Sequence, residues 1–546
     1  MKRHLLLVAI VALASFLRLF GLGAKTLWLD EVLSWRLLQF PVTEMVSRTG
    51  GTGTVHPPLY FLLLRTWVTV WGDSEVALRL LSACCGVITV IGIYVLLLEL
   101  MSLSDPAKDP GLSSGRKRTT ALLATTLVAL SPLQVHMARQ TRGYSLATAL
   151  FVWGSWLLVR ALRSKGRQAG YWIGFGVCTL ALCYTHYVAL LSAVSQGLFV
   201  LLYLLWPPRA VDEGPTSPDG TPITDRTWLT GKVTWAGGVL LAVTIGFLSW
   251  LPALVNQTST VSGGSWQPPL SATRVAIETY ISLFSTFANR ASINLTYAWL
   301  ATALVAAAML VLLTRHGWGE RFLALTGLMP ALLMLLYSSA AHPNLYYSRY
   351  LTFVQLAWLA GLAILVTHIP NRYYRRAWAA ALLAGSVYGC YASWDEIGSH
   401  ANPGMRGAMA YVRAHGADDE PIVTMHGTTF LESLYYSRQS RKPYFLMAEA
   451  PAVGSIQKSA HLKLDDFISA RVLASRKCRG IWLVFRDGEK VQGRLATFLP
   501  YPITRVTSKS FLQDYRWEGS SVVVEHYRPG KSSEFPELAA TRGPEP

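Results

Sequence analysis

Two adjacent carboxylates, Asp30 and Glu31, follow the first apolar stretch of the chain and lie between Trp28 and Trp35. A carboxylate that is partly desolvated at a membrane surface becomes more basic and can accept a proton from a hydroxyl group. Because adjacent residues point in different directions on a helix or strand, one of the two is expected to do the chemistry. Asp30 could instead be the N-cap of a helix that begins at Glu31. The residues alone leave both roles open.

Three arginines lie beside long apolar stretches. Arg139 and Arg142 belong to the segment HMARQTRGYSL, and Arg349 belongs to YYSRYL. An arginine at this depth is energetically costly, tends to face the interior of a helix bundle, and suits an anion such as phosphate. The alternative is that these side chains extend to the lipid headgroups. Tyr144 and Tyr350 stand in the same two motifs and complete this set of candidate substrate-binding residues.

A further candidate, His56, precedes Pro57 and Pro58, which suit the entry to a helix. His56 could hydrogen-bond a substrate, bind a metal, or have a purely structural role. The other histidines of the apolar part are scattered and lack the spacing of metal ligands. No cofactor is therefore predicted, and the involvement of a divalent metal stays open.

The elements that must position these residues are membrane helices. Of the 546 residues, 52% are hydrophobic and only 15% are charged, whereas an average soluble protein is about 25% charged. The mean hydropathy is +0.33 and the isoelectric point is about 9.7. Basic residues cluster in short loops between apolar stretches, so the basic character reflects membrane orientation and does not indicate a nucleic-acid partner. Disordered proteins, coiled coils and conventional soluble enzymes are poor fits to this composition.

A membrane span requires roughly 20 mostly apolar residues. Eleven spans are expected, near residues 5–23, 76–100, 119–136, 144–162, 170–185, 187–206, 232–255, 292–314, 322–341, 350–368 and 377–394. If the N-terminus is cytoplasmic, the loops richest in Lys and Arg all fall on the cytoplasmic side. The chain from residue 395 onward is then exoplasmic. The predicted location is the plasma (inner) membrane, crossed many times.

Two long exoplasmic segments belong to the predicted membrane domain, residues 1–394. Residues 24–74 contain two short apolar stretches that are expected to lie as helices in the membrane interface. Four tryptophans of this segment are expected at headgroup depth, namely Trp28, Trp35, Trp67 and Trp71. Residues 256–291 join a Ser/Thr/Gly-rich stretch to an amphipathic helix, and a long loop of this kind is a candidate lid.

The remaining residues have the charge density of a soluble domain. From Asp395 onward there are 20 Lys and Arg against 17 Asp and Glu, whereas the first 394 residues have 29 against 14. Alternating patterns predict strands at 421–426, 443–447, 480–486, 503–511 and 521–527, and helices at 405–416, 428–439, 464–476 and 489–500. Residues 395–530 are therefore predicted to form a small exoplasmic α/β domain, followed by a disordered tail at 531–546.

Several motifs together resemble one family. In order they are LWLDEVLSW, HPPLYFLLLRTW, EVALRLLSACCGV, ARQTRGYSLATAL, YTHYVALL and SRYL. Their order and spacing over roughly residues 1–395 resemble the C-type (GT-C) membrane glycosyltransferases. More specifically, they are similar to the family-39-like bacterial enzymes related to protein O-mannosyltransferases and the lipid A aminoarabinose transferase. The resemblance implies a polytopic GT-C-like helical fold of about eleven spans with the C-terminal α/β domain outside the membrane.

The resemblance also implies an activity and roles for individual residues. The expected reaction transfers a sugar from a polyprenyl-phosphate donor in the membrane lipid to a glycan, lipid or protein acceptor on the exoplasmic face. Asp30, with Glu31 beside it, takes the place of the family's acidic base, while Arg142, Arg349 and more loosely Arg139 take the place of its phosphate-binding cations. The chain departs from the family at Gln140, where an acidic residue is common, which puts a role for that position in doubt.

Two other classes of protein also fit a polytopic chain with buried arginines. A transporter or flippase of lipid-linked sugars usually shows internal repeats and interrupted helices near the midplane. No convincing repeat is found in this sequence, and the candidate residues lie at one interface. A membrane sensor would need a cytoplasmic output domain, and no such domain is recognised. Glycosyl transfer is therefore the preferred prediction, with a transporter or flippase as the alternative.

Overall fold

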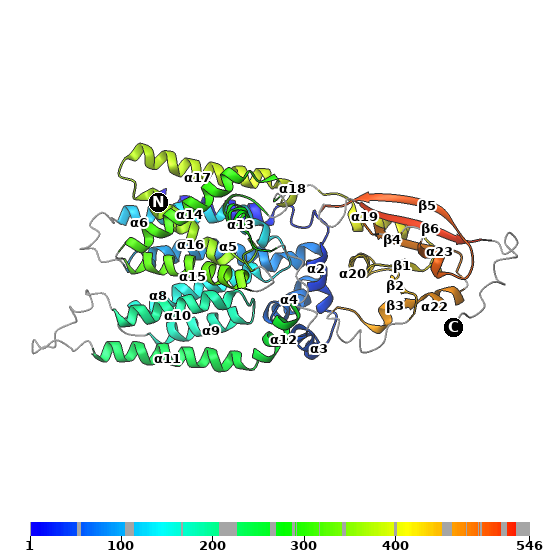
Figure 1. Cartoon of the computed structure of the whole chain (residues 1–546), viewed down its shortest axis with the longest axis horizontal. Helices are drawn as coiled ribbons and strands as arrows, with labels where there is room; N and C mark the ends of the chain where they lie inside the picture. Colours follow the sequence, from blue (N-terminus) through cyan, green and yellow to red (C-terminus); the bar gives the residue numbers. More distant parts are fainter. Residues whose placement is uncertain are drawn as a thin grey trace, which may run out of the picture. The chain divides into compact units, whose positions relative to one another are not determined.

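The computed structural model describes residues 2–51, 56–103, 114–164, 168–206, 226–261, 269–286, 290, 292–315, 317–340, 345–397, 401–449, 461–476, 478–489, 491, 494–514 and 521–530. The chain divides into two compact units (Figure 1). The helical unit comprises Met1–Leu22 and Val42–Ser399, and the C-terminal unit comprises Gly23–Pro41 and His400–Pro546. The predicted disordered tail, 531–546, and part of the candidate lid, 262–268, lie outside the described residues.

The helical unit consists of helices, and its long helices run side by side (Figure 1). They are α1 (Lys2–Leu19), α3 (Val42–Gly50), α4 (Leu59–Trp71), α5 (Glu75–Leu100), α6 (Ser114–Ala129), α7 (Pro132–Ala138), α8 (Tyr144–Arg163), α9 (Ala169–Cys183), α10 (Ala189–Leu205), α11 (Arg226–Leu248), α12 (Leu251–Val261), α13 (Ala272–Phe284), α14 (Leu295–Thr314), α15 (Trp318–Ala340), α16 (Thr352–Thr367), α17 (Arg372–Ala392) and α18 (Trp394–Ile397).

The chain is a multi-pass membrane protein, and its longest apolar helices coincide with predicted spans. Among the described residues, five helices are long and apolar enough to cross a membrane, or six if the bent pair α6 and α7 forms one span. The other five predicted spans fall on α1, α9, α10, α16 and α17. The first four of these contain shorter apolar helices, and the total of eleven spans stays a prediction.

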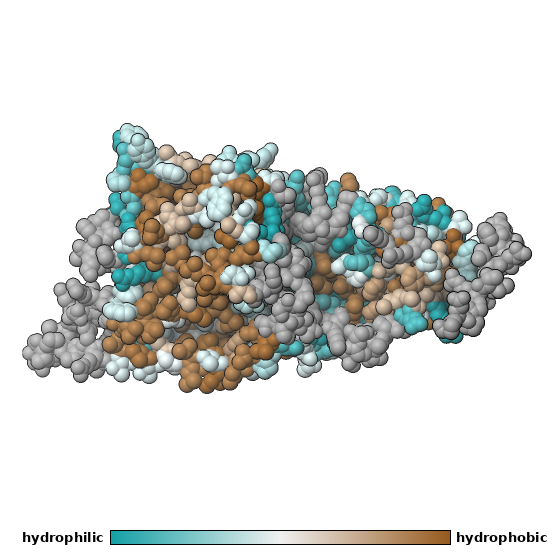
Figure 2. All heavy atoms as spheres, viewed as in Figure 1, coloured by the Kyte–Doolittle hydropathy of each residue, from teal (hydrophilic) through white to brown (hydrophobic). Residues whose placement is uncertain are grey.

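The surface of the helical unit is suited to lipid contact. Apolar residues cover most of the face seen in Figure 2. On α11, for example, Leu240, Leu241 and Ile245 are all exposed. Monomeric soluble proteins rarely expose apolar patches of this extent, so the natural environment of this surface is the hydrocarbon of a bilayer.

Two local features determine where the loop between α7 and α8 lies. Ser131 begins α7, where its hydroxyl accepts a hydrogen bond from the Gln134 N–H at 3.3 Å and Pro132 occupies the first turn. At this break α7 turns by 58° from α6. On the facing helix α5, a Cβ at Gly86 would lie 2.7 Å from the Ala138 Cβ at the end of α7. Only glycine therefore allows α5 and α7 to approach this closely.

The C-terminal unit is built on a six-stranded mixed sheet with strand order β3-β2-β1-β4-β6-β5. Its elements are α2 (Leu29–Leu37), α19 (Gly404–His415), β1 (Ile422–Thr424), α20 (Gly427–Tyr436), β2 (Tyr444–Met447), η3 (Leu464–Asp466), β3 (Phe467–Ser469), α22 (Ala470–Ser475), β4 (Ile481–Arg486), α23 (Arg494–Phe498), β5 (Ile503–Leu512) and β6 (Ser521–Pro529). The strands β3, β2, β1 and β4 pair in parallel, and β6 and β5 complete the sheet antiparallel.

The predicted α/β pattern of this unit is largely confirmed. All five predicted strands are present, and helices form at two of the predicted positions as α19 and α20. The single helix predicted at 464–476 is wrong, because that stretch contains η3, the strand β3 and only then the short helix α22. Of the helix predicted at 489–500, the described residues are helical only over Arg494–Phe498.

The segment Gly23–Pro41 belongs to the C-terminal unit although the sequence groups it with the membrane domain. Arg36 on α2 forms a buried ion pair with Asp466 at 2.5 Å and donates a hydrogen bond from Nε to the His461 carbonyl at 2.9 Å. Trp35 lies edge-on to Tyr435 of α20, with ring centroids 5.1 Å apart. Trp28 and Trp35 are both buried within the protein, so their expected position at headgroup depth stays a prediction.

The second expected interfacial helix is α4. Trp71 at its end is exposed, while Trp67 is half-buried and donates a hydrogen bond from Nε1 to the Ala77 carbonyl at 3.0 Å. Gly72 ends this helix with φ of 75°, a left-handed conformation that glycine adopts without strain. The chain then turns into α5.

Candidate functional site

The core of the candidate site is a contact between His56 and Arg142. The Arg142 Nη2 atom lies 2.6 Å from His56 Nε2. The His56 ring also lies 5.3 Å from the ring of His186 and 6.3 Å from that of Tyr144, and the last two rings are 5.1 Å apart. Tyr144 and His186 are each only 3% exposed. Three predicted site residues, His56, Arg142 and Tyr144, thus lie close to His186. From the sequence, His186 is one of the scattered histidines and is not a candidate.

Backbone hydrogen bonds explain why these residues meet. The N–H of Leu59, at the start of α4, donates to the Tyr184 carbonyl at 3.0 Å, which joins the His56 loop to the turn between α9 and α10 that carries His186. The Arg142 carbonyl accepts a hydrogen bond from the Ser82 hydroxyl of α5 at 3.0 Å. Two long-range hydrogen bonds therefore hold the His56 and Arg142 turns in place.

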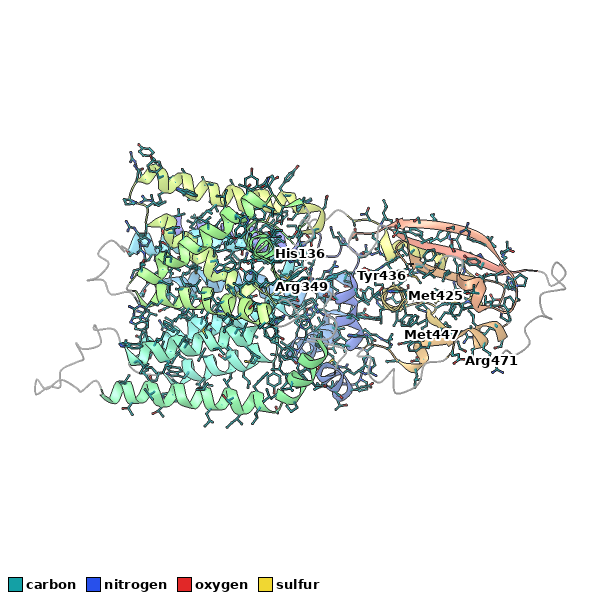
Figure 3. All side chains as sticks on the ribbon, viewed as in Figure 1. His136, Arg349, Met425, Tyr436, Met447 and Arg471 are labelled. Carbon is teal, nitrogen blue, oxygen red and sulfur yellow. The ribbon has the colours of Figure 1, made fainter. Side chains whose placement is uncertain are left out.

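Arg349 and Tyr350 reach the same place from the turn before α16. The Tyr350 ring lies 5.8 Å from that of His186, and it packs on the small apolar cluster that includes Tyr144. The guanidinium of Arg349 lies 5.2 Å from the ring centre of Tyr347 (Figure 3). Arg349 and Arg142 are both close enough to His56 and His186 for their charges to act on these imidazoles.

The electrostatics of this cluster keep both histidines neutral. Burial, with the charges of Arg142 and Arg349 nearby, lowers the pKa of His186 to about 3. Burial also holds the pKa of His56 well below its usual value, and Arg142, His186 and Arg349 add to this effect. The cations in the cluster are therefore the two arginines, and each imidazole offers one donor and one acceptor.

The hydrogen bonds of His186 assign its donor. Its Nδ1 accepts a hydrogen bond from the Val188 N–H at 3.2 Å, so the proton resides on Nε2. Within the part of the chain that the structure describes, this buried Nε2 has no hydrogen-bond partner. Buried polar groups are normally paired, so an orphan N–H beside two arginines points to a ligand that accepts hydrogen bonds. The cluster is donor-rich and cationic, an arrangement that suits an anion.

A second group of charges supports the turn that carries Arg349. Glu278 on α13 is fully buried and accepts the Ser348 N–H at 2.8 Å, and its carboxylate pairs with Arg274 at 3.0 Å and Arg290 at 2.8 Å. The Arg290 guanidinium in turn lies 4.4 Å from the ring centre of Tyr347. Sequence reasoning missed this group, although Glu278 is the only acidic residue between positions 256 and 291.

Arg139 makes several hydrogen bonds to backbone carbonyls. Its guanidinium donates to the carbonyls of Leu17 at 3.2 Å, Phe20 at 2.8 Å and Gly21 at 3.1 Å. These carbonyls belong to the C-terminal end of α1, where a cation is favourable because the last carbonyls lack helical partners. The observed contacts thus make Arg139 a cap of the end of α1, and its role as a phosphate ligand stays a prediction.

Gln140, where the chain departs from the resembling family, belongs to a buried network. Its side-chain nitrogen contacts His136 Nε2, and that His136 atom lies 3.3 Å from a carboxylate oxygen of Glu396. Thr286 donates a hydrogen bond to the same carboxylate. These contacts join α7 to α18 and give Gln140 a structural role.

Asp30 and Glu31 lie on α2 in the C-terminal unit. The N-cap of α2 is Trp28, so Asp30 is the second residue of the helix and the prediction that it could be the cap is wrong. Glu31 is fully buried, and its carboxylate accepts the Trp28 N–H at 3.4 Å. The capping function therefore belongs to Glu31, which leaves Asp30 as the half-buried carboxylate of the pair.

Metal binding finds no support in the described residues. Within them, no group of three or more His, Cys, Asp and Glu side chains is arranged to hold a metal ion. Within the same residues, His56 contacts an arginine and other aromatic rings. A metal is thus not assigned to this site.

The sequence itself matches no protein-family model and no curated protein. The structure is similar to that of ArnT from Cupriavidus metallidurans in the apo state, with a TM-score of 0.56 and 12% identity over 95% of this chain and 97% of that one. It is also similar to ArnT from the same organism bound to undecaprenyl phosphate, with a TM-score of 0.54 and 11% identity over 98% and 99% of the two chains. Over nearly its whole length, this chain has the fold of the GT-C glycosyltransferases.

Proposed function

We propose that this protein transfers a sugar from a polyprenyl-phosphate donor to a lipid, glycan or protein acceptor on the exoplasmic face of the membrane. The observation that carries the proposal is the convergence of Arg142, Arg349 and the unpaired Nε2–H of His186 in one buried cluster. Such donors match the oxygens of a phosphate monoester or diester. The fold agrees, because one similar structure, that of ArnT, has undecaprenyl phosphate bound.

The residues of the cluster have separate roles in this proposal. Arg142 and Arg349 bind the phosphate of the donor, and His186 donates a hydrogen bond from Nε2. His56 accepts from Arg142 and so fixes the direction of its guanidinium. Tyr144 and Tyr350 form the aromatic wall around His186. Glu278, through Ser348 and Arg290, holds the Arg349 turn in position.

The reaction needs a leaving group, a nucleophile and a base. The acceptor hydroxyl attacks the anomeric carbon, the bond between that carbon and the phosphate oxygen breaks, and the lipid phosphate departs as an anion. The two arginines stabilise the charge that develops on this phosphate. We assign Asp30 as the base that takes the hydroxyl proton, because it is half-buried whereas Glu31 is fully buried.

A direct test supplies radiolabelled polyprenyl-phosphate sugars to membrane vesicles of the expressing cells, which contain the protein and its acceptors. We expect the label to move from the lipid donor to an acceptor, and Arg142→Ala to reduce this transfer at least ten-fold. Arg376→Ala, which removes an exposed arginine of α17, is the matched control and should transfer normally. If the label crosses the bilayer but stays on its lipid, the protein is a flippase and the proposal is wrong.

A further inference from the structure

The C-terminal unit contains a cavity of about 650 Å³ that the proposed transfer step does not use. Its lining comes from α19, from the loop before β1, from the start of β4, and from β5 and β6. Small-molecule sites typically have volumes of roughly 300–1,000 Å³ and combine apolar walls with a few well-placed polar groups. The cavity therefore has the size of a site for a small ligand.

A buried carboxylate organises one wall of this cavity. Glu420 is 5% exposed, and both of its carboxylate oxygens are engaged. One oxygen is paired with His526 Nε2 at 3.0 Å. The other accepts hydrogen bonds from the Trp482 indole N–H at 2.7 Å and from the Ala417 N–H at 3.0 Å. Burial alone would raise the pKa of Glu420, but these hydrogen bonds and the nearby His526 outweigh burial and lower the pKa. The carboxylate is thus ionised and fully engaged, and it fixes His526 so that Nδ1 remains for a ligand.

Aromatic rings form the rest of this wall. His526 stacks on Trp482 with ring centroids 4.3 Å apart and an interplanar angle of 11°, and Tyr411 lies edge-on to Trp482 at 6.1 Å. A Cβ at Gly480 would lie 2.3 Å from His526 Nε2 and 2.6 Å from a Glu420 oxygen. Only glycine at this position permits the arrangement, so the wall depends on a specific local sequence.

The strand β5 is irregular where it borders the cavity. Its pairing with β6 shifts register between Arg505 and Thr507, which leaves Val506 as an extra residue opposite the partner strand. Val506 and Thr507 both line the cavity. Bulges of this kind redirect side chains and are over-represented beside functional sites.

Two guanidinium groups belong to the cavity lining, and one of them forms an ion pair with Asp419. The Arg479 side chain is 83% exposed and lies 3.6 Å from Asp419, too far for a direct hydrogen bond. Arg528 is also exposed. The oxygens of Glu420, the one lining carboxylate, are taken by its neighbours. An incoming ligand therefore meets two arginines with available N–H donors.

We propose that this cavity binds an anionic saccharide, a sugar whose carboxylate or phosphate pairs with Arg479 and Arg528. The hydroxyls of the sugar bond to His526 Nδ1 and to the Thr507 hydroxyl. Forked guanidinium donors suit carboxylate and phosphate oxygens, and the imidazole and hydroxyl groups suit the hydroxyls of a sugar. This inference rests on the proposed function in one respect, since such a saccharide is the natural acceptor or part of it.

The test measures binding of three probes to the full-length protein in nanodiscs by calorimetry and saturation-transfer NMR. The probes are glucuronic acid, glucose 6-phosphate and glucose, which separate a carboxylate, a phosphate and a neutral sugar. We expect at least one acidic sugar to bind about ten-fold more tightly than glucose, and Arg479→Gln/Arg528→Gln to remove this preference. Arg471→Gln, which removes an exposed charge on α22 of the same unit (Figure 3), should bind as the wild type does.

Equal binding of glucose and both acidic sugars would overturn the inference, as would an unchanged preference in the double variant. An equal loss in the Arg471 variant would show that net charge, and no specific site, attracts the probes. Both altered arginines are exposed, and thermal unfolding of each variant verifies the fold.

Binding of undecaprenyl phosphate is measured on the same samples. If the protein binds undecaprenyl phosphate normally but binds no acidic sugar, only the cavity site is contradicted. If it binds an acidic sugar but not undecaprenyl phosphate, only the proposed function is contradicted.

Discussion

At the scale of single residues, the structure separates two carboxylates that are neighbours in the sequence. Glu31 is buried and accepts the Trp28 N–H, whereas Asp30 occupies the second position of α2 and is half-buried. The sequence shows only an acidic pair, and nothing in it distinguishes the two. The start of α2 at Leu29, which decides their roles, depends on how Glu31 packs in the folded unit.

The assignment of Asp30 as the base predicts a specific loss. Asp30→Asn should reduce sugar transfer by on the order of 10²–10⁴-fold, since an amide cannot accept the proton, while undecaprenyl phosphate binding stays unchanged. Glu31→Gln is the matched control, because its amide oxygen still accepts the Trp28 N–H and transfer should persist. Initial rates with a labelled donor measure both variants, and full activity of Asp30→Asn would remove Asp30 from the mechanism.

The lowered pKa of His186 predicts that the protein becomes less stable as the pH falls. Its folded pKa is about 3, below the unfolded value of about 6.5. Above pH 6.5 His186 is neutral in both the folded and the unfolded protein, so its protonation does not reduce the free energy of unfolding. As the pH falls below 6.5, only the unfolded chain is protonated, and stability decreases by about 2 kcal/mol at pH 5.

The measurement compares thermal unfolding in detergent at pH 7.5 and pH 5 for the wild type and His186→Gln. The variant lacks this titrating group and should lose less stability on acidification than the wild type. An identical loss in both proteins would mean that His186 is protonated in the folded state at pH 5, contrary to the neutral imidazole in the candidate site.

At the scale of elements, α2 depends on partners that are distant in the sequence. Arg36 and Asp466 are 430 positions apart, and their side chains are 6% and 0% exposed. Arg406 adds hydrogen bonds to the carbonyls of Gly23 and Ala24 at 3.1 Å. The helix that carries Asp30 is thus held by the C-terminal unit.

This anchoring predicts that the C-terminal unit is required for catalysis. Removing one partner of a buried ion pair costs about 3–5 kcal/mol, so Arg36→Ala should destabilise α2 and reduce transfer. A double-mutant cycle with Asp466→Ala isolates the pair from its other contacts. Donor binding, which we place in the helical unit, should be unaffected. Wild-type transfer by Arg36→Ala would show that α2 needs no such anchor.

The same elements show what the sequence could and could not predict. Long apolar segments predicted the membrane helices, and alternating segments predicted five of the six strands. Both patterns can be read from neighbouring residues in the sequence. The strand β3 is only three residues long and lies inside a helix-like pattern. Arg142 and Arg349 were found from their apolar surroundings. His186 was not found in this way, because its position depends on the long-range hydrogen bond from the Leu59 N–H to the Tyr184 carbonyl.

At the scale of the whole molecule, the distribution of basic residues predicts the orientation in the membrane. A reporter that is active only after export should be active when fused after Trp394, and one that requires the cytoplasm should be active when fused after Arg376. Both expectations follow from a cytoplasmic N-terminus and eleven spans. A cytoplasmic signal after Trp394 would place the C-terminal unit on the wrong side for an exoplasmic reaction.

The central claim is that the cluster of Arg142, Arg349, His56 and His186 holds the phosphate of a polyprenyl carrier. The most direct measurement is the affinity for undecaprenyl phosphate in nanodiscs, compared between the wild type and the Ala and Lys variants of Arg142 and Arg349. We predict that each Ala variant binds at least ten-fold more weakly. Lys should restore only part of the affinity, because it keeps the charge and loses the fork of N–H donors. Unchanged binding in both Ala variants, or complete recovery in both Lys variants, would contradict the claim and identify these arginines as headgroup anchors.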